Sequence, residues 1–208
     1  MRGAAVSLRI PRSEDAQRLF ELASDPEVTR FFSWGPYEHP DEAAAWLATL
    51  PARRASGTAL ELVIVDRDDW VIGITGVLEA SPRDRRCVVG TWLGSAYWGT
   101  GANPASKALV AHLAFGPLRM ERLGAWADVR NPRSQRALER LGFVREGTLR
   151  AFHRHYDERR DVISYSLLRD EWLGSALAAS AVDIHGAPPE PFVCAQRAGG
   201  LSAPPAPA

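Results

Sequence analysis

The chain has 208 residues with 25 basic and 25 acidic side chains, and therefore no formal net charge. This length can bury the apolar core of one ordinary domain, and the neutral balance excludes a protein drawn to nucleic acid or anionic membranes by its overall charge. The two cysteines, Cys87 and Cys194, offer neither a disulfide framework nor a CxxC metal site.

The first fifty residues predict one strand and two helices around an aromatic loop. Residues 7–10 are typical of a short strand, and Ser13 is the expected N-cap of a helix that stops at Asp25-Pro26. The segment FFSWGPYEHP, residues 31–40, is an aromatic loop rich in turn-forming residues. The apolar residues after it recur at i, i+3, i+4 and i+7 and predict an amphipathic helix. They are Ala43, Trp46, Leu47 and Leu50.

The rest of the chain predicts strands first and then alternating helices and strands. Runs at residues 58–65, 70–78 and 87–93, separated by turn formers, indicate an antiparallel meander. The later elements are a helix ending at Phe115, a strand at 122–129, a helix at 131–143 with Gly142 as left-handed C-cap, and strands near 144–156 and 161–168. This order predicts an α/β (α+β) sandwich with a mixed sheet.

The composition changes near residue 174. Residues 175–208 are rich in alanine and proline and end in APPAPA. They contain too few large apolar side chains to offset the entropy lost on ordering. We therefore expect one domain at residues 1–174 and a flexible tail at residues 175–208.

The sequence contains no recognisable targeting segment. Its first residues lack the apolar stretch of a secretory signal, and no run approaches the roughly 18 apolar residues that span a bilayer. We expect a cytoplasmic protein, a monomer or a homodimer, without a nucleic-acid, membrane or metal partner.

The segment YWGTGANPASKALV, residues 97–110, places two glycines directly before a predicted helix. Glycine loses the most backbone entropy on folding, so Gly99 and Gly101 indicate either positive φ angles or the close approach of a ligand. Asn103-Pro104 and Asn131-Pro132 each pair an expected N-cap with a proline at the first helical position. A helix N-terminus attracts phosphate, but the spacing fits neither G-x-G-x-x-G nor a P-loop. These residues alone are equally compatible with a tight turn.

The wider pattern closely resembles the GNAT acetyltransferase superfamily, in particular the RimJ/RimL type (ribosomal-protein-alanine N-acetyltransferases). The resemblance rests on WGTGAN between a strand and a helix, and then on SQRALERLGFVREGTLR and RRDVISYSLLRDEW, across roughly residues 6–173. It implies the GNAT acyl-CoA N-acyltransferase fold, with a mixed central sheet of about seven strands flanked by about four helices. It also implies an enzyme that transfers an acetyl group from acetyl-CoA to a primary amine, with the N-terminal α-amine of a protein or peptide as the expected acceptor.

By this resemblance, backbone amides of one loop bind the pyrophosphate of acetyl-CoA. The loop residues are Trp98, Gly99, Thr100, Gly101, Ala102 and Asn103. Trp98 stands where the family usually has arginine or glutamine, so a basic side chain is missing. Lys107, one turn into the helix, is the expected replacement for part of that charge.

The resemblance also implies that strands ending near Leu93 and Val129 separate around the pantetheine arm. Asn131 matches a family asparagine that contacts pantetheine, although capping its helix would explain it fully. Gly90 is either a bulge glycine that frees an N–H for the thioester oxygen or a packing glycine.

Two residues are expected to move protons. Leu138 replaces the tyrosine that protonates the leaving thiolate in many relatives, so Ser134, three residues after the asparagine and also beside the cofactor, is the implied acid. His153 stands where RimL-like enzymes carry a glutamate, and an imidazole suits a general base. The other interpretations are an ordinary first-turn serine and a solvated strand end.

The acceptor is expected between the aromatic loop and the final hairpin. Trp34 and Phe32 are the expected contacts, and Glu79 and Asp128, at predicted strand ends, are further candidates both for contacts and for the general base. An α-amine, with a pKa of about 7.7–8.0, would suit a weak base better than a lysine side chain near 10.4. Two other functions remain compatible with the sequence: acetylation of a small-molecule amine such as an antibiotic or metabolite, and weakly catalytic acyl-CoA binding.

Overall fold

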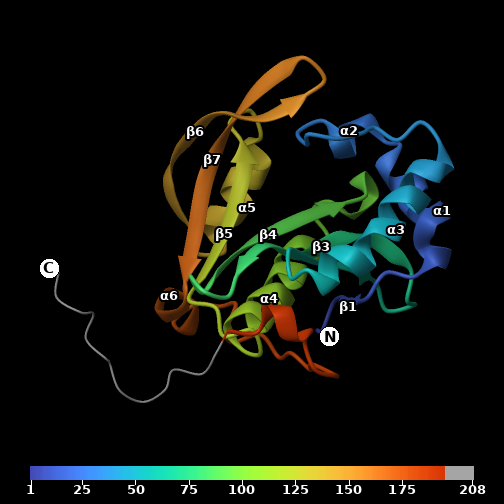
Figure 1. Ribbon diagram of the computed structural model, residues 1–208. Coiled ribbons are helices and arrows are strands. Elements are labelled where there is room, and N and C mark those ends of the chain that lie inside the picture. Colours follow the sequence, from blue (N-terminus) through green and yellow to red (C-terminus); the bar gives the residue numbers. More distant parts are fainter. Residues whose placement is uncertain (195–208) are drawn as a thin grey trace, which may run out of the picture.

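Seven strands form one mixed sheet in the structure, a computed structural model that describes residues 1–194 (Figure 1). The strands are β1 (Ser7–Arg9), β2 (Ala59–Val65), β3 (Val71–Ser81), β4 (Arg86–Leu93), β5 (Arg122–Asp128), β6 (Val144–His155) and β7 (Glu158–Leu168). Their order is β1-β2-β3-β4-β5-β7-β6, and every neighbouring pair is antiparallel except β4 and β5. The expected mixed sheet is confirmed.

Helices cover both faces of this sheet. They are α1 (Ala16–Ala23), α2 (Pro26–Thr29), α3 (Pro40–Ala55), α4 (Ala102–Phe115), α5 (Pro132–Arg140) and α6 (Arg169–Leu173). Helices α1 and α3 share an apolar cluster with Val63 and Val65 of β2, whereas α4, α5 and α6 contribute to a larger core that includes Leu62 and Ile64. Every residue of β2 is buried, as expected for a strand covered on both faces. Among residues 1–194, no helix combines the length and apolar character needed to cross a bilayer.

The parallel strands β4 and β5 pair over a short distance only. Their register runs from Arg86 opposite Arg122 to Val88 opposite Gly124. Beyond that point β4 continues to Leu93 on the side of β3, and β5 continues on the side of β7. The expected separation of these strands is therefore confirmed, and it opens the sheet near its centre.

Two expected helix starts are wrong. Ser13 does not cap a helix: it begins a 3-10 turn, where the Asp15 carboxylate accepts from the Arg12 backbone N–H at 2.7 Å. Helix α4 begins at Ala102 with Gly101 at the N-cap, in a left-handed conformation, instead of Asn103. The glycine reaches a φ of +89° without strain, which lets the helix begin earlier than the Asn-Pro pair predicts.

Other local predictions are confirmed. The Asn131 side chain accepts from the Ser134 backbone N–H at 3.1 Å and caps α5. Gly142 has a φ of +88° after the end of that helix. The expected stop at Asp25-Pro26 also starts the short helix α2, because the Asp25 carboxylate accepts from the Glu27 N–H at 2.9 Å.

Residues 175–194 do not form the expected flexible tail. Leu177, Phe192 and Cys194 are buried in the large core. The Cys194 N–H donates to the Leu118 carbonyl at 3.1 Å, and the Arg2 N–H donates to the Asp183 carbonyl at 2.8 Å. A few well-spaced apolar anchors suffice to dock a segment whose average composition is poor in large apolar residues. Residues 195–208 of the expected tail lie outside the described residues.

We predict that Phe192→Ala lowers the free energy of unfolding by about 3–5 kcal/mol, because this ring is completely buried. Urea denaturation followed by circular dichroism measures the change. Leu173→Ala is the matched control, because Leu173 is 61% exposed and its removal should cost little. Equal losses in the two variants would contradict the docking of residues 175–194.

Candidate active site

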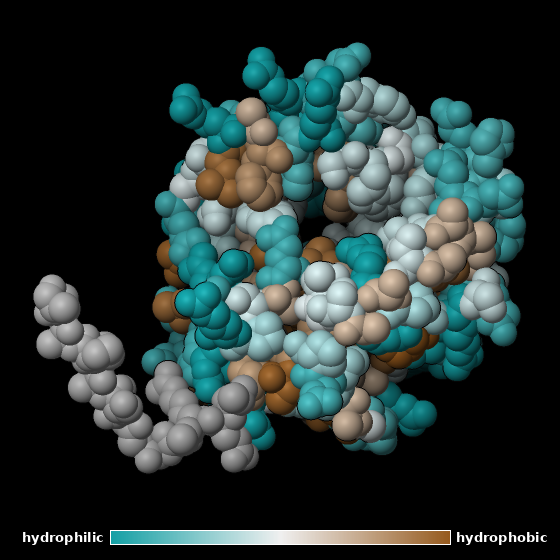
Figure 2. Space-filling view, in the orientation of Figure 1, coloured by the Kyte–Doolittle hydropathy of each residue, from teal (hydrophilic) through white to brown (hydrophobic). Residues whose placement is uncertain are grey.

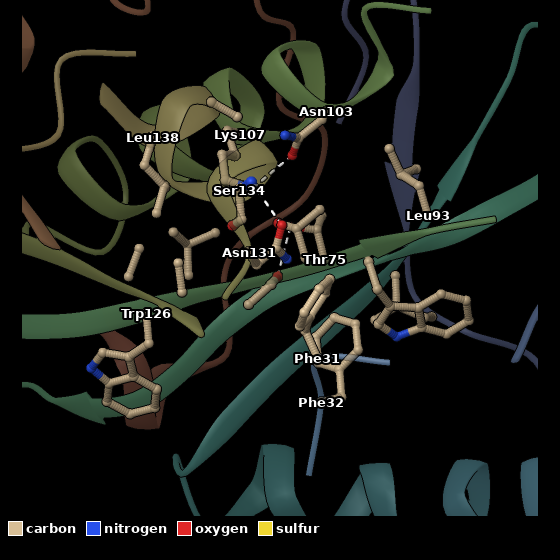
Figure 3. Close-up of a pocket in the computed structure, with 18 of the residues that line it drawn as sticks. Phe31, Phe32, Thr75, Leu93, Asn103, Lys107, Trp126, Asn131, Ser134 and Leu138 are labelled. Atoms are coloured by element: carbon tan, nitrogen blue, oxygen red, sulfur yellow. Dashed lines mark hydrogen bonds between the residues drawn. The ribbon is translucent and has the colours of Figure 1, made fainter. Parts of the chain in front are cut away.

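A connected cavity of about 1070 Å³ lies where β4 and β5 separate, and its lining comes from both faces of the sheet. Helices α4 and α5 line one side, and the aromatic loop, α3 and β2 line the other. Figure 2 shows the surface hollowed between the β6–β7 hairpin and α2. In Figure 3, Lys107, Asn131 and Ser134 point into the cavity on the helical side, with Phe31 and Phe32 beyond the strands.

Most of the residues expected to bind or react lie along this cavity. They are Phe32, Trp34, Gly90, Trp98, Gly99, Gly101, Asn103, Lys107, Asp128, Asn131, Ser134 and His153.

Three expected site residues do not line the cavity. The Thr100 hydroxyl donates to the Tyr97 carbonyl at 2.8 Å and thereby fixes the glycine turn. Ala102 is packed in the core, and Glu79 is exposed to solvent. The side chains of these three residues are therefore unavailable for direct contacts in the cavity.

The glycine loop has both positive φ angles and open space beside its backbone, the two explanations of its glycines that the sequence left open. Gly99 and Gly101 have φ angles of +78° and +89°, so the turn itself requires glycine. A Cβ at either position would meet no protein atom within 4 Å, so the space beside the backbone is open. The loop leads into the N-terminus of α4, a 14-residue helix whose first N–H groups and dipole favour an anion. The arrangement fits a phosphate group.

Lys107 is a buried cation beside this loop. Its Nζ donates to the Asn103 Oδ1 at 2.7 Å, and no carboxylate among residues 1–194 pairs with it. Burial lowers the pKa of Lys107 to about 7. A neighbouring anion would stabilise the protonated ammonium, which still has donors to offer.

A second cation, Arg133, was missed by sequence reasoning. Its guanidinium carbon lies 3.5 Å from the centre of the Trp98 ring, and the Trp98 indole donates to the Leu93 carbonyl at 3.0 Å. The tryptophan that replaces the expected basic residue therefore holds a basic residue from the first turn of α5. Only the fold brings these positions together, so no local pattern could have revealed the pair.

Asn131 and Ser134 lie at the start of α5. Because the Asn131 carbonyl oxygen caps the helix, its amide N–H groups remain available to the cavity. The Ser134 hydroxyl has no hydrogen-bond partner among the described residues and can donate to a ligand. Leu138, at the position of the family tyrosine, is buried and supplies no acid.

Gly90 is in regular register with Gly76 of β3, so the bulge, one of the two interpretations of this glycine, is not seen in that pairing. A Cβ at Gly90 would lie 2.7 Å from the Leu78 Cδ1. The structure thus agrees with the packing interpretation of this glycine.

His153 lies on the acceptor side with a partly buried ring. Ring centres of Trp126 and Phe152 lie 5.9 and 5.0 Å from it. Burial lowers the pKa of His153, against the opposing attraction of Asp128 and Glu79. A lowered pKa leaves the imidazole neutral at pH 7, which is the form that accepts a proton.

Asp128 is held by an arginine and is a poor base. Its carboxylate accepts from the Arg130 backbone N–H at 2.8 Å and from the Arg130 guanidinium at 3.1 Å. Arg130 also pairs with Glu158 at 2.6 Å. These bonds to Arg130 outweigh the effect of burial and keep the pKa of Asp128 low.

The aromatic loop and the final hairpin, between which the acceptor is expected, contact each other. The Arg160 guanidinium donates to the carbonyls of Arg30 and Phe32 at 2.8 and 3.0 Å. Trp34 lies between Phe32 and Trp92, with ring centres 5.3 and 5.7 Å away. The loop thus forms an aromatic wall that is braced by β7.

Sequence reasoning also missed Glu61, which lines the cavity from β2. A signal existed, because ALELVIV places one acidic residue in an otherwise apolar buried run.

Among residues 1–194, no group of three or more histidine, cysteine, aspartate or glutamate side chains is arranged to hold a metal ion.

Comparison with known proteins gives consistent results. A family model described as an acetyltransferase (GNAT) domain matches residues 6–144. The uncharacterized N-acetyltransferase p20 of Bacillus licheniformis is 31% identical over 171 residues, which cover 81% of this chain and 96% of that protein. The ribosomal-protein-serine acetyltransferase of Escherichia coli (strain K12) is 30% identical over 112 residues, 53% of this chain and 62% of that protein. Spermidine N-acetyltransferase from Vibrio cholerae, solved with CoA and spermine, shares the fold with a TM-score of 0.71 at 20% identity, over 81% of this chain and 98% of that chain.

We predict that the pKa of His153, followed by NMR of the ring protons, lies below the ordinary value of about 6.5. Phe152→Ala should raise the pKa, because removing one wall hydrates the ring and favours the imidazolium form. A wild-type value above 6.5 would mean that the attraction of Asp128 and Glu79 outweighs burial, and it would contradict this prediction.

Proposed function

Since this chain belongs to the GNAT acetyltransferase family and is an N-acetyltransferase that uses acetyl-CoA, we propose that its acceptor is the N-terminal α-amine of a protein or peptide. The observation that carries the proposal is the continuous cavity. The cations Lys107 and Arg133 lie on the side of α4 and α5, and the aromatic wall and the neutral imidazole of His153 lie on the other side. A ribosomal-protein-serine acetyltransferase among the relatives supports a protein acceptor. An α-amine with a pKa of about 7.7–8.0 needs only the weak base that a histidine supplies.

In the proposed complex, acetyl-CoA supplies an acetyl group activated as a thioester. The backbone of Gly99 and Gly101 and the start of α4 hold its diphosphate, with Lys107 and Arg133 as the cations that compensate its charge. Asn131 binds the pantetheine arm where β4 and β5 no longer pair.

The proposed reaction is a direct attack in a ternary complex. His153 removes a proton from the acceptor ammonium, directly or through water, and the free amine attacks the acetyl carbon. As the new N–C bond forms, the C–S bond breaks, and the Ser134 hydroxyl donates its proton to the sulfur. The surplus proton of the amine and the proton taken up by His153 leave to solvent, from which Ser134 is reprotonated.

An acceptor screen tests this proposal. Release of the CoA thiol is measured with peptides that have a free N-terminus, the same peptides blocked at the N-terminus but carrying lysine, a polyamine and an aminoglycoside. We expect the free N-termini to give the highest kcat/KM. Preferred turnover of a lysine side chain or a small amine would replace the proposed acceptor, and acetyl-CoA binding without turnover of any amine would contradict catalysis.

Within this assay, Ser134→Ala should lower kcat by about 10²-fold while the KM values change little, because loss of a general acid affects the transition state. Ser13→Ala, on the exposed 3-10 turn, is the control. An unchanged kcat for Ser134→Ala would remove the acid role from Ser134.

Lys107 gives a separate prediction for the cofactor side. At pH 8 its ammonium is mostly deprotonated, because burial lowers its pKa to about 7. A bound phosphate group raises that pKa. Binding of acetyl-CoA at pH 8 should therefore be accompanied by the uptake of up to about one proton by Lys107. Calorimetric titrations in two buffers of different ionisation enthalpy measure this uptake.

Lys107→Met is the comparison that isolates the effect, since phosphate groups of the ligand also titrate. The variant should take up fewer protons and bind acetyl-CoA about 10- to 100-fold more weakly, the loss expected for one charged hydrogen bond. Equal proton uptake in both proteins would contradict a contact between Lys107 and the phosphates.

A further inference from the structure

Glu61 is a buried carboxylate that the proposed chemistry does not use. Its side chain is 6% exposed, and one oxygen pairs with the Arg53 Nη2 of α3 at 2.7 Å. The other oxygen, Oε2, is buried without a hydrogen-bond partner among residues 1–194. Burial raises the pKa of Glu61, against the attraction of Arg53. Burying a carboxylate oxygen without a hydrogen-bond partner costs free energy. An ion pair that only supported packing would not require such a partnerless oxygen.

On the same face of the sheet, the residues in register with Glu61 on β3 and β4 are both glycines. Glu61 lies opposite Gly76 of β3, and Gly76 lies opposite Gly90 of β4, so all three share one face. Glycines inside strands weaken a sheet and often mark the close approach of a backbone or a ligand. Backbone contact explains Gly76, where a Cβ would lie 2.4 Å from the Leu60 carbonyl oxygen, but Gly90 would meet only the flexible end of Leu78.

Gly76 and Gly90 thus form a bare strip that connects Glu61 with the strand at the opening of the sheet. Aromatic rings border the same cavity, among them Trp34, Trp46 and Trp92. Aromatic faces attract cations, and a carboxylate at the end of an aromatic-walled space favours a positively charged ligand.

We propose that Glu61 binds a cationic group of the acceptor, an alkylammonium or a guanidinium, at the end of the bare strip. Oε1 stays with Arg53, and we assign the partnerless Oε2 to the ligand, because a carboxylate accepts through both oxygens. The charge of Arg53 opposes the rise in the pKa of Glu61 and favours the ionised form.

The position of Glu61 defines which part of the acceptor it binds. Two strand spacings, roughly 10 Å, separate β2 from β4. The bound cation is therefore not the amine that reacts at the opening, and the acceptor is a primary amine that carries a second positive charge. This last step rests on the proposed function, whereas the cation site itself does not.

A binding experiment tests the cation site without any transfer reaction. The indole N–H signals of Trp34, Trp46 and Trp92 are followed by NMR during titration with n-butylammonium chloride and, separately, with the neutral n-butanol. We expect saturable shifts that are stronger for butylammonium in the wild type and a loss of this preference in Glu61→Gln. Glu21→Gln, which removes an ion-paired carboxylate of α1 outside the cavity, should retain the preference.

A kinetic experiment tests the second charge on the acceptor. Two peptides begin with serine and have either arginine or its neutral isostere citrulline as the second residue. We expect the wild-type KM to be at least about tenfold lower for the arginine peptide, and the ratio to approach one in Glu61→Gln with an unchanged KM for acetyl-CoA. Glu61→Asp, which keeps the charge, should retain part of the ratio.

The outcomes separate the two proposals. Butylammonium binding that depends on Glu61, without transfer to any peptide, would support the cation site and contradict the α-amine acceptor. Equal KM values for both peptides together with equal effects of butylammonium and butanol in the wild type would overturn the cation site. A lower melting temperature in Glu61→Gln with an unaltered preference for cations would assign Glu61 to packing alone.

Discussion

The separation of β4 from β5 after three residue pairs is the constraint on which the whole site depends. Past Val88 and Gly124 these strands no longer pair with each other, so backbone groups that a closed sheet would use are left to the cavity. The opening stays rigid because the outer edges remain paired, β4 with β3 up to Leu93 and β5 with β7 up to Asp128. The cavity therefore connects the two faces of the sheet through its centre.

The charges around this opening are separated although the chain as a whole is neutral. Lys107 and Arg133 lie on the side of α4 and α5, and neither pairs with a carboxylate among the described residues. Glu61 lies on the opposite face, where Arg53 pairs with one of its two oxygens. The side of α4 and α5 thus has two cations without a carboxylate partner among the described residues, and the other side has a carboxylate with one partnerless oxygen. Net charge describes the field far from the protein and says nothing about such a local division.

How much the sequence predicts depends on the range of the interactions concerned. Strand runs, the Asn131 cap and the left-handed Gly142 follow from a few neighbouring residues, and all three predictions are correct. The docking of Phe192 and the stacking of Arg133 on the Trp98 ring join segments that are distant along the chain, so composition and local spacing cannot reveal them. The family pattern singled out the glycine loop, which lines the cavity, and the Asn131 start of α5, whereas the expected start of α4 at Asn103 is wrong. The family pattern carries no information on Glu61, because the role proposed for that side chain depends on its register with glycines on two other strands.

The observed start of α4, two residues before the predicted one, explains how Lys107 can remain buried. An asparagine before proline is normally used as a helix cap, where its side-chain oxygen accepts a backbone N–H. Because Gly101 takes the cap in a left-handed conformation, the Asn103 oxygen is released and accepts the Lys107 ammonium one turn later. That bond satisfies one of the three donors of an ammonium and leaves the others for a ligand. The residues that break the local rule are thus the ones to which the proposed function assigns the phosphates, and functional sites are where sequence rules and structure are expected to disagree.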